Sequence, residues 1–238
     1  MEGLEEFFDG LPGSAVEASR RLENAFHPRY LCRLMTRLSE LAHAPHATID
    51  TIAAHLDALD HAGRMRELAK TTRDDQRALW VKAAAAPELT YAHFVPDGVP
   101  AKTPVVHHGR NTLPLPGQQK FFRKPMARPE DGSARAFGYN DAPTQSLVGP
   151  GYFVLVPTKG NAEWERRGAW VVDYFQVPDG AVPSSWPKVV PNTQGLQRFV
   201  YHGTRDFMRR ISAHVSIGAA FKGEKPLDHY FTLCREDR

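Results

Sequence analysis

The chain has 238 residues, of which 42% are hydrophobic and 24% are charged, and its formal net charge at pH 7 is +3. These values lie near the averages of globular proteins and exclude extended disorder over most of the chain. The Lys and Arg residues form no concentrated run, so we expect no nucleic-acid partner.

The termini and the cysteines indicate a cellular location. Cys32 and Cys234 are too few and too far apart for a disulfide framework or a CxxC motif, which suits a reducing cytoplasm. Acidic residues surround Phe7 and Phe8, which is the wrong charge sign for a signal peptide. No apolar run approaches the roughly 20 residues that span a bilayer. We therefore expect a soluble, cytoplasmic protein with no membrane partner.

The composition changes near residue 90. After this position lie 15 of the 19 prolines, 14 of the 18 glycines and 19 of the 24 aromatic residues. Such residues are typical of turns and strands. We predict a helical segment over 1–90, a Pro-rich connection over 91–118 and a mainly antiparallel β domain over 119–238.

Four helices are predicted in the first segment. A capping box, in which Ser14 and Glu17 each satisfy a free backbone amide, starts the first. Thr48 and Thr72 precede the third and fourth, and Asp74 and Asp75 complement the dipole of the fourth. The predicted helices cover residues 14–26, 28–44, 48–63 and 72–87.

The β domain is predicted from short apolar runs that turn residues separate. The predicted strands cover residues 119–123, 135–139, 152–156, 169–177, 196–201, 212–221 and 229–234. One helix is predicted over Thr204–Ile211, with Thr204 as its cap. The fold class is therefore α+β, with an N-terminal helical bundle and a mainly antiparallel C-terminal β-barrel or sandwich.

Asp173 is the most unusual residue of the predicted sheet. Strand alternation places it on one face with Val171 and Phe175, among apolar neighbours. A carboxylate in that position needs hydrogen bonds or a raised pKa, which makes it a candidate general acid or base. The structural alternative is that Asp173 accepts a buried hydrogen bond and only stabilises the fold.

His214 stands on a predicted strand whose polar and apolar residues alternate. Ser212 and Ser216 share its face, and Val215 and Ile217 lie on the other. If the polar face lines a cavity, His214 can bind or protonate a ligand near neutral pH. If it faces solvent, the strand is an ordinary half-exposed one.

These residues lead to two hypotheses that share one pocket. The first is a small-molecule-binding protein, in which the concave side of the β domain has room for a ligand. The predicted ligand contacts are Tyr152, Tyr174, Ser212 and Ser216. The second is an enzyme that uses Asp173 and His214 as an acid/base pair in the same pocket.

A third hypothesis rests on the apolar stripe of the second predicted helix. Leu31, Leu34, Leu38 and Leu41 would be exposed in an isolated helix and covered in a homodimer. The N-terminal helices would then serve dimerisation or docking of a partner protein.

No motif identifies a metal site or a cofactor. HExxH, CxxC and GxSxG motifs are absent, and Gly149–Gly151 lacks the ending of a phosphate-binding loop. The adjacent His107 and His108 would point in opposite directions on an extended segment. We predict no metal site, although 11 histidines leave room for one assembled in three dimensions. The cofactor, if any, stays open.

Overall fold

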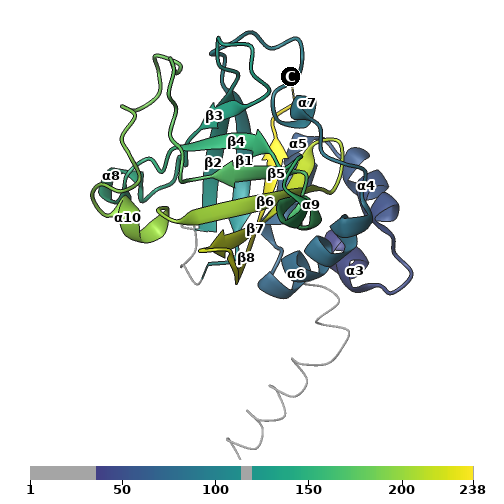
Figure 1. Ribbon diagram of the computed structural model, residues 1–238. Helices are drawn as coiled ribbons and strands as arrows, with labels where there is room; N and C mark the ends of the chain where they lie inside the picture. The colour runs from purple at the N-terminus through teal and green to yellow at the C-terminus, as the bar shows by residue number, and fades with distance from the viewer. Residues whose placement is uncertain (1–35, 114–119, 238) are drawn as a thin grey trace, which may run out of the picture. The chain divides into compact units, whose positions relative to one another are not determined.

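An eight-stranded antiparallel barrel forms the centre of the computed structural model, which describes residues 36–113 and 120–237 (Figure 1). Each strand pairs with the next one along the chain, and β8 pairs with β1 to close the barrel. The strands are β1 (Val105–Asn111), β2 (Phe121–Ala127), β3 (Ala136–Gly138), β4 (Phe153–Pro157), β5 (Trp170–Asp173), β6 (Thr204–Arg210), β7 (Val215–Lys222) and β8 (Lys225–Arg235). The prediction of a mainly antiparallel barrel or sandwich is confirmed, and the sheet is a closed barrel.

Large and small side chains alternate inside the barrel. Three glycines each lie opposite a phenylalanine of the neighbouring strand, and a Cβ atom on any of them would overlap the aromatic ring. The pairs are Gly109 with Phe122, Gly138 with Phe153, and Gly218 with Phe231. Since eight strands enclose a space just wide enough for side chains, such pairs let the rings pack without widening the barrel.

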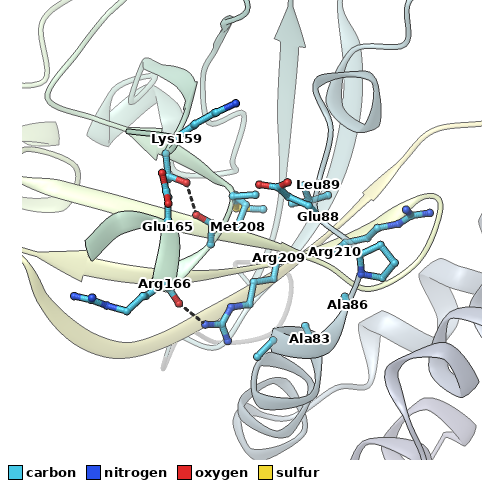
Figure 2. Close-up of a pocket in the computed structure, with 15 residues that line it drawn as sticks. Ala83, Ala86, Glu88, Leu89, Lys159, Glu165, Arg166, Met208, Arg209 and Arg210 are labelled. Carbon is cyan, nitrogen blue, oxygen red and sulfur yellow. Dashed lines mark hydrogen bonds between the residues drawn. The ribbon is translucent and has the colours of Figure 1, made fainter. Parts of the chain in front are cut away.

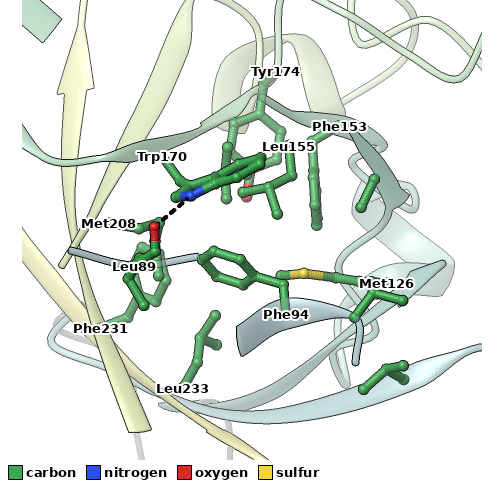
Figure 3. Packing of buried hydrophobic residues seen from close by; sticks show 14 of the residues in the cluster. Leu89, Phe94, Met126, Phe153, Leu155, Trp170, Tyr174, Met208, Phe231 and Leu233 are labelled. Carbon is green, nitrogen blue, oxygen red and sulfur yellow. Dashed lines mark hydrogen bonds between the residues drawn. The ribbon is translucent and has the colours of Figure 1, made fainter. Parts of the chain in front are cut away.

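Apolar side chains fill the interior, as Figure 3 shows. Phe94, on the short helix α7 (Tyr91–Phe94), lies among the barrel residues with its ring 5.9 Å from that of Trp170. The indole Nε1 of Trp170 donates a hydrogen bond to the Leu89 carbonyl at 2.9 Å. The segment before β1 therefore closes this end of the barrel, which we call the closed end. The room for a ligand that we expected inside the barrel is occupied by these side chains.

Four helices pack on the outer face of β7 and β8. They are α3 (Arg37–His43), α4 (Ile49–Asp57), α5 (His61–Ala69) and α6 (Arg73–Lys82), which the 3-10 turn η1 (Ala83–Ala85) follows. Leu38 and Leu41 are buried in one cluster with Ile217 of β7 and Cys234 of β8. The described half of the leucine stripe thus contacts the protein's own sheet. The predicted helix over 14–26, like Leu31 and Leu34, lies outside the described residues.

Two helices start at the predicted positions, and side-chain caps fix both starts. The Thr48 side chain accepts a hydrogen bond from the backbone of Thr51, and Thr72 forms a full capping box with Asp75. The third predicted helix, over 48–63, contains α4 and only the first residues of α5, which continues to Ala69. Asp60 interrupts the predicted helix because its side chain caps a new helix start.

Two predictions after residue 190 are wrong. Residues 196–201 contain the short helix α10 (Gln197–Val200) in place of a strand, and residues 204–210 form β6 in place of a helix. In β6 the adjacent Phe207 and Met208 point to opposite sides of the sheet, and both are fully buried. A helix with one apolar face could not bury both so completely.

The loops between the strands carry two further short helices. They are α8 (Gln145–Val148), between β3 and β4, and α9 (Ala162–Arg167), between β4 and β5. Strand β1 itself lies in the segment 91–118, which we predicted as a Pro-rich connection. No helix among the described residues combines the length and apolar character that a membrane-crossing helix requires.

Candidate functional site

Asp173 occupies a structural position. It ends β5 on the outer face of the barrel and is 2% exposed. Its carboxylate accepts hydrogen bonds from the backbone of Phe175 at 3.0 Å and from Gln176 Nε2 at 2.9 Å. The Nε atom of Arg205 lies 3.3 Å from the same carboxylate, as an ion pair without hydrogen-bond geometry. These partners match the structural interpretation, in which Asp173 holds the chain beyond β5 in place.

His214 lies at the other end of the barrel. It belongs to the turn between β6 and β7, and its Nδ1 is 3.2 Å from a carboxylate oxygen of Asp237, again without hydrogen-bond geometry. Asp173 pairs across the sheet with Arg205 at the start of β6, whereas His214 follows the end of β6. The strand between them spans roughly 20 Å at about 3.3 Å per residue. The predicted acid/base pair therefore shares no cavity.

The four predicted ligand contacts are also separated. Tyr152 lies on the outer face, where its hydroxyl donates to the Pro187 carbonyl, and Tyr174 lies inside the barrel. Ser212 is in the β6–β7 turn. Ser216 faces the interior opposite Arg210, with a buried Oγ atom that has no hydrogen-bond partner among the described residues. Only Ser212 and Ser216 lie near His214.

A polar cluster, the Lys124 centre, lies inside the barrel at the end opposite the closed end. It consists of Lys124, Asn140, Tyr174 and Asp206. The ammonium Nζ of Lys124 donates hydrogen bonds to Asn140 Oδ1 at 2.7 Å and to the Tyr174 hydroxyl at 2.5 Å. The Asp206 carboxylate is 3.9 Å away. Sequence analysis singled out only Tyr174 of these four.

The Lys124 centre is sealed from solvent. Four aromatic rings lie 4.8 to 5.5 Å from the ammonium, and they belong to Phe122, Phe153, Tyr174 and Phe231. Burial lowers the pKa of Lys124 to about 8 and raises the pKa of Asp206 to about 6. Because the ammonium donates two hydrogen bonds within the cluster and none of the four pockets described is lined by Lys124, Asn140, Tyr174 or Asp206, we assign the centre to the stability of the fold.

An open pocket of about 200 Å³ lies at the closed end, and we call it the basic pocket. Its lining residues are Thr90, Ala92, His93, Arg210, Ala213 and Arg235. Arg210 and Arg235 end β6 and β8, and His93 comes from α7, the helix that closes the barrel. The fold thus brings three nitrogen-bearing side chains from distant parts of the chain to one small space.

The electrostatics of the basic pocket favour a negative ligand. No described carboxylate lines it, and none forms an ion pair with Arg210. One guanidinium nitrogen of Arg210 donates to the Ser212 carbonyl at 3.3 Å, and Arg235 donates to the Ala92 carbonyl at 3.1 Å. The partner of Arg210 in this contact is a neutral carbonyl, so the contact leaves the positive charge of Arg210 in place.

His93 lines the basic pocket, and one of its ring nitrogens lacks a hydrogen-bond partner among the described residues. It is only 7% exposed, and its Nε2 atom has no hydrogen-bond partner among the described residues. Burial holds the pKa of His93 well below its usual value, and the positive charges of His107, Arg235 and Arg210 lower it further. Buried polar atoms in native proteins are nearly always paired, so an unpaired one beside a pocket points to a missing partner.

A larger pocket of about 440 Å³ shares Arg210 with the basic pocket, and we call it the outer pocket (Figure 2). Figure 2 shows Arg209 and Arg210 leaving β6 in different directions, as neighbours on a strand do. The apolar part of its lining includes Ala83, Ala86, Leu89 and Met208, and the charged part includes Glu88, Lys159, Glu165 and Arg166. A third pocket, which His214 lines, shares Arg235.

The residues of the basic pocket could not be predicted as a site, for local reasons. The last predicted strand ended at Cys234, one residue before Arg235. Arg210 fell in the predicted helix, and His93 in the predicted connection. The alternation of Thr204, Asp206, Met208 and Arg210 would have indicated the shared face of Arg210 had the segment been taken as a strand.

Comparison with known proteins adds no relative: no family model, curated protein or solved structure matches the chain. Within residues 36–113 and 120–237, no group of three or more His, Cys, Asp or Glu side chains could hold a metal ion. The chemistry of the site therefore follows from its own residues.

Proposed function

We propose that the protein binds a small organic anion at the closed end of its barrel. The anionic group occupies the basic pocket between Arg210, Arg235 and His93, and the less polar part of the ligand extends over the outer pocket. The observation that carries this proposal is the buried, unpaired Nε2 atom of His93 in one pocket with Arg210, a guanidinium with which no described carboxylate forms an ion pair.

The side chains of the basic pocket suit a carboxylate or a phosphate. Guanidinium groups form paired, charge-assisted hydrogen bonds with both groups. A neutral His93 donates a further hydrogen bond when its proton is on Nε2. A ligand oxygen at this point would satisfy His93 and offset the mutual repulsion of the arginines at the same time.

The sizes of the two pockets agree with a metabolite-sized ligand. The basic pocket, at about 200 Å³, holds little more than the anionic group, while the outer pocket measures about 440 Å³. Known small-molecule sites occupy about 300 to 1,000 Å³ and combine apolar walls with a few polar groups. Ala83, Leu89 and Met208 supply such a wall.

Thermal unfolding with a panel of anions tests the proposal. The panel contains phosphate, a phosphate monoester, and short and long monocarboxylates, each compared with sodium chloride at equal ionic strength. A ligand at 100 times its Kd stabilises the folded state by about 2.7 kcal/mol, which is several degrees in Tm for a domain of this size. We expect at least one organic anion to raise the Tm well beyond the chloride control.

The variant Arg210→Gln removes one of the two guanidinium groups and should abolish that stabilisation. Arg66→Gln is the matched control, because Arg66 is exposed on α5 and lines none of the pockets described. In the wild-type protein, the imidazole 15N resonances of His93 should move on titration with the same anion. Equal stabilisation of the wild type and Arg210→Gln, or an unmoved His93, would refute the site.

A further inference from the structure

Exposed apolar side chains gather on the loops at the end of the barrel opposite the closed end. Of the seven large apolar side chains that are exposed among the described residues, four lie on or next to α8 and α10. They are Leu147 (71% exposed), Leu196 (49%), Phe199 (63%) and Val200 (48%), and we call them the apolar tip. Single exposed apolar residues are ordinary, but a group of four on adjoining loops indicates an interaction site.

The two loops of the apolar tip are joined to one another. The side chain of Gln197 packs against Gly149, directly after α8, and accepts a hydrogen bond from the Gly151 backbone at 3.2 Å. Figure 1 shows α8 and α10 side by side, beyond the ends of the central strands. Tyr201, directly after α10, stacks on Tyr174 with ring centroids 5.3 Å apart. Contacts with the barrel thus hold the two loops in place, while the four apolar side chains stay exposed.

Positive side chains lie beside the α10 part of the apolar tip. The guanidinium carbon of Arg198 lies 4.6 Å from the centre of the Phe199 ring, and Lys222 Nζ is 3.4 Å from the Phe199 carbonyl oxygen. Lys225 pairs with Lys222 across the β7–β8 hairpin. The carboxylate of that hairpin, Glu224, is engaged by two arginines of the barrel wall. No described carboxylate forms an ion pair with Arg198, Lys222 or Lys225.

We propose that the apolar tip binds the surface of an anionic lipid bilayer. Leu147, Leu196, Phe199 and Val200 enter the boundary between headgroups and acyl chains, and the three cations contact acidic headgroups. Apolar residues within a positive rim are the features that hold proteins at such interfaces. The expectation of no membrane partner rested on the absence of a long apolar run, whereas the tip is assembled from two short loops.

Other partners fit the apolar tip less well. The four pockets described are lined by other residues, so none of them forms a groove there for a peptide. A second copy of the chain, meeting the first tip to tip, would bring like charges together at its rim. A bilayer with acidic headgroups supplies both a flat apolar layer and the opposite charge.

Flotation with lipid vesicles tests the proposal on the full chain. One set of vesicles contains phosphatidylcholine alone, and the other contains phosphatidylcholine with phosphatidylserine. We expect the protein to float with the second set only, and to be released by high salt. Phe199→Asp should abolish flotation, and Arg198→Gln should lower the partition coefficient roughly fivefold, as loss of one cation near an anionic surface does.

The control variant is Val81→Asp, which places the same charge on an exposed apolar position of α6, outside the tip. It should float like the wild type. Absence of flotation with the acidic vesicles, or equal flotation of Phe199→Asp and the wild type, would overturn the proposal. So would a dimer in solution that Phe199→Asp dissociates while neither protein floats, because the tip would then serve contact between copies.

Discussion

Replacing the buried charges of the Lys124 centre should change how the stability of the protein depends on pH. The variant is Lys124→Met combined with Asp206→Asn, which keeps the approximate volumes and removes both charges. In the wild type, burial lowers the pKa of Lys124 from 10.5 to about 8 and raises that of Asp206 from 3.8 to about 6. Both groups therefore titrate at different pH values in the folded and unfolded chains.

The sign of each contribution follows from which state holds the proton. Between pH 3.8 and about 6, folded Asp206 keeps a proton that the unfolded chain has lost, so stability falls as the pH rises. Between about pH 8 and pH 10.5, folded Lys124 has lost a proton that the unfolded chain keeps, so stability rises with pH. Each shift is about two units, and one unit corresponds to about 1.4 kcal/mol, so each change amounts to about 3 kcal/mol.

Urea unfolding of both proteins across this pH range measures the effect. Relative to the wild type, the double variant should gain about 3 kcal/mol between pH 3.8 and about 6, and lose about 3 kcal/mol between about pH 8 and pH 10.5. Lys124→Met alone leaves Asp206 without its cation and should destabilise the protein by about 3 to 5 kcal/mol at neutral pH. Parallel pH profiles for the wild type and the double variant would refute the assignment of a buried charged pair.

Two further predictions concern the packing of the barrel. Gly218→Ala places a Cβ atom in steric overlap with the Phe231 ring, and urea unfolding should show a loss of stability of about 1 to 3 kcal/mol. Gly98→Ala is the control, because a Cβ atom there meets open space, and it should have little effect. Equal effects of the two would contradict the close packing of ring on glycine. Trp170→Phe removes the hydrogen bond to the Leu89 carbonyl and should lower stability by about 1 to 3 kcal/mol. Unchanged hydrogen exchange at the closed end in this variant would show that the bond does not hold the segment.

Local chemistry explains which features could be predicted. The helix starts at Thr48 and Thr72 are set by side chains that cap the backbone within three residues. The strands around Phe153 and Trp170 are apolar runs that both faces of a sheet can bury. Each of these signals lies within a few neighbouring residues, so it can be recognised without knowledge of the rest of the fold.

The candidate sites depend on contacts that no short window contains. Lys124 follows the predicted end of a strand by one residue, and the register with β1 and the rings of β4 and β8 are what bury its ammonium. Arg210 and Arg235 meet because β6 and β8 both pair with β7 and end beside the same turn. The segment of β6 is predicted as a helix because Thr204 and Asp206 resemble a helix start, a signal that ignores the strands on either side.

The sequence by itself determined two helix starts, the apolar strand runs and the antiparallel character of the β domain, because each arises from interactions between near neighbours. Only the tertiary structure decided that the strands close on themselves and fill their interior with side chains. Closure moves the polar groups either into a sealed cluster or to the ends of the barrel. There, residues as distant in sequence as His93 and Arg235, which are 142 positions apart, meet around one pocket.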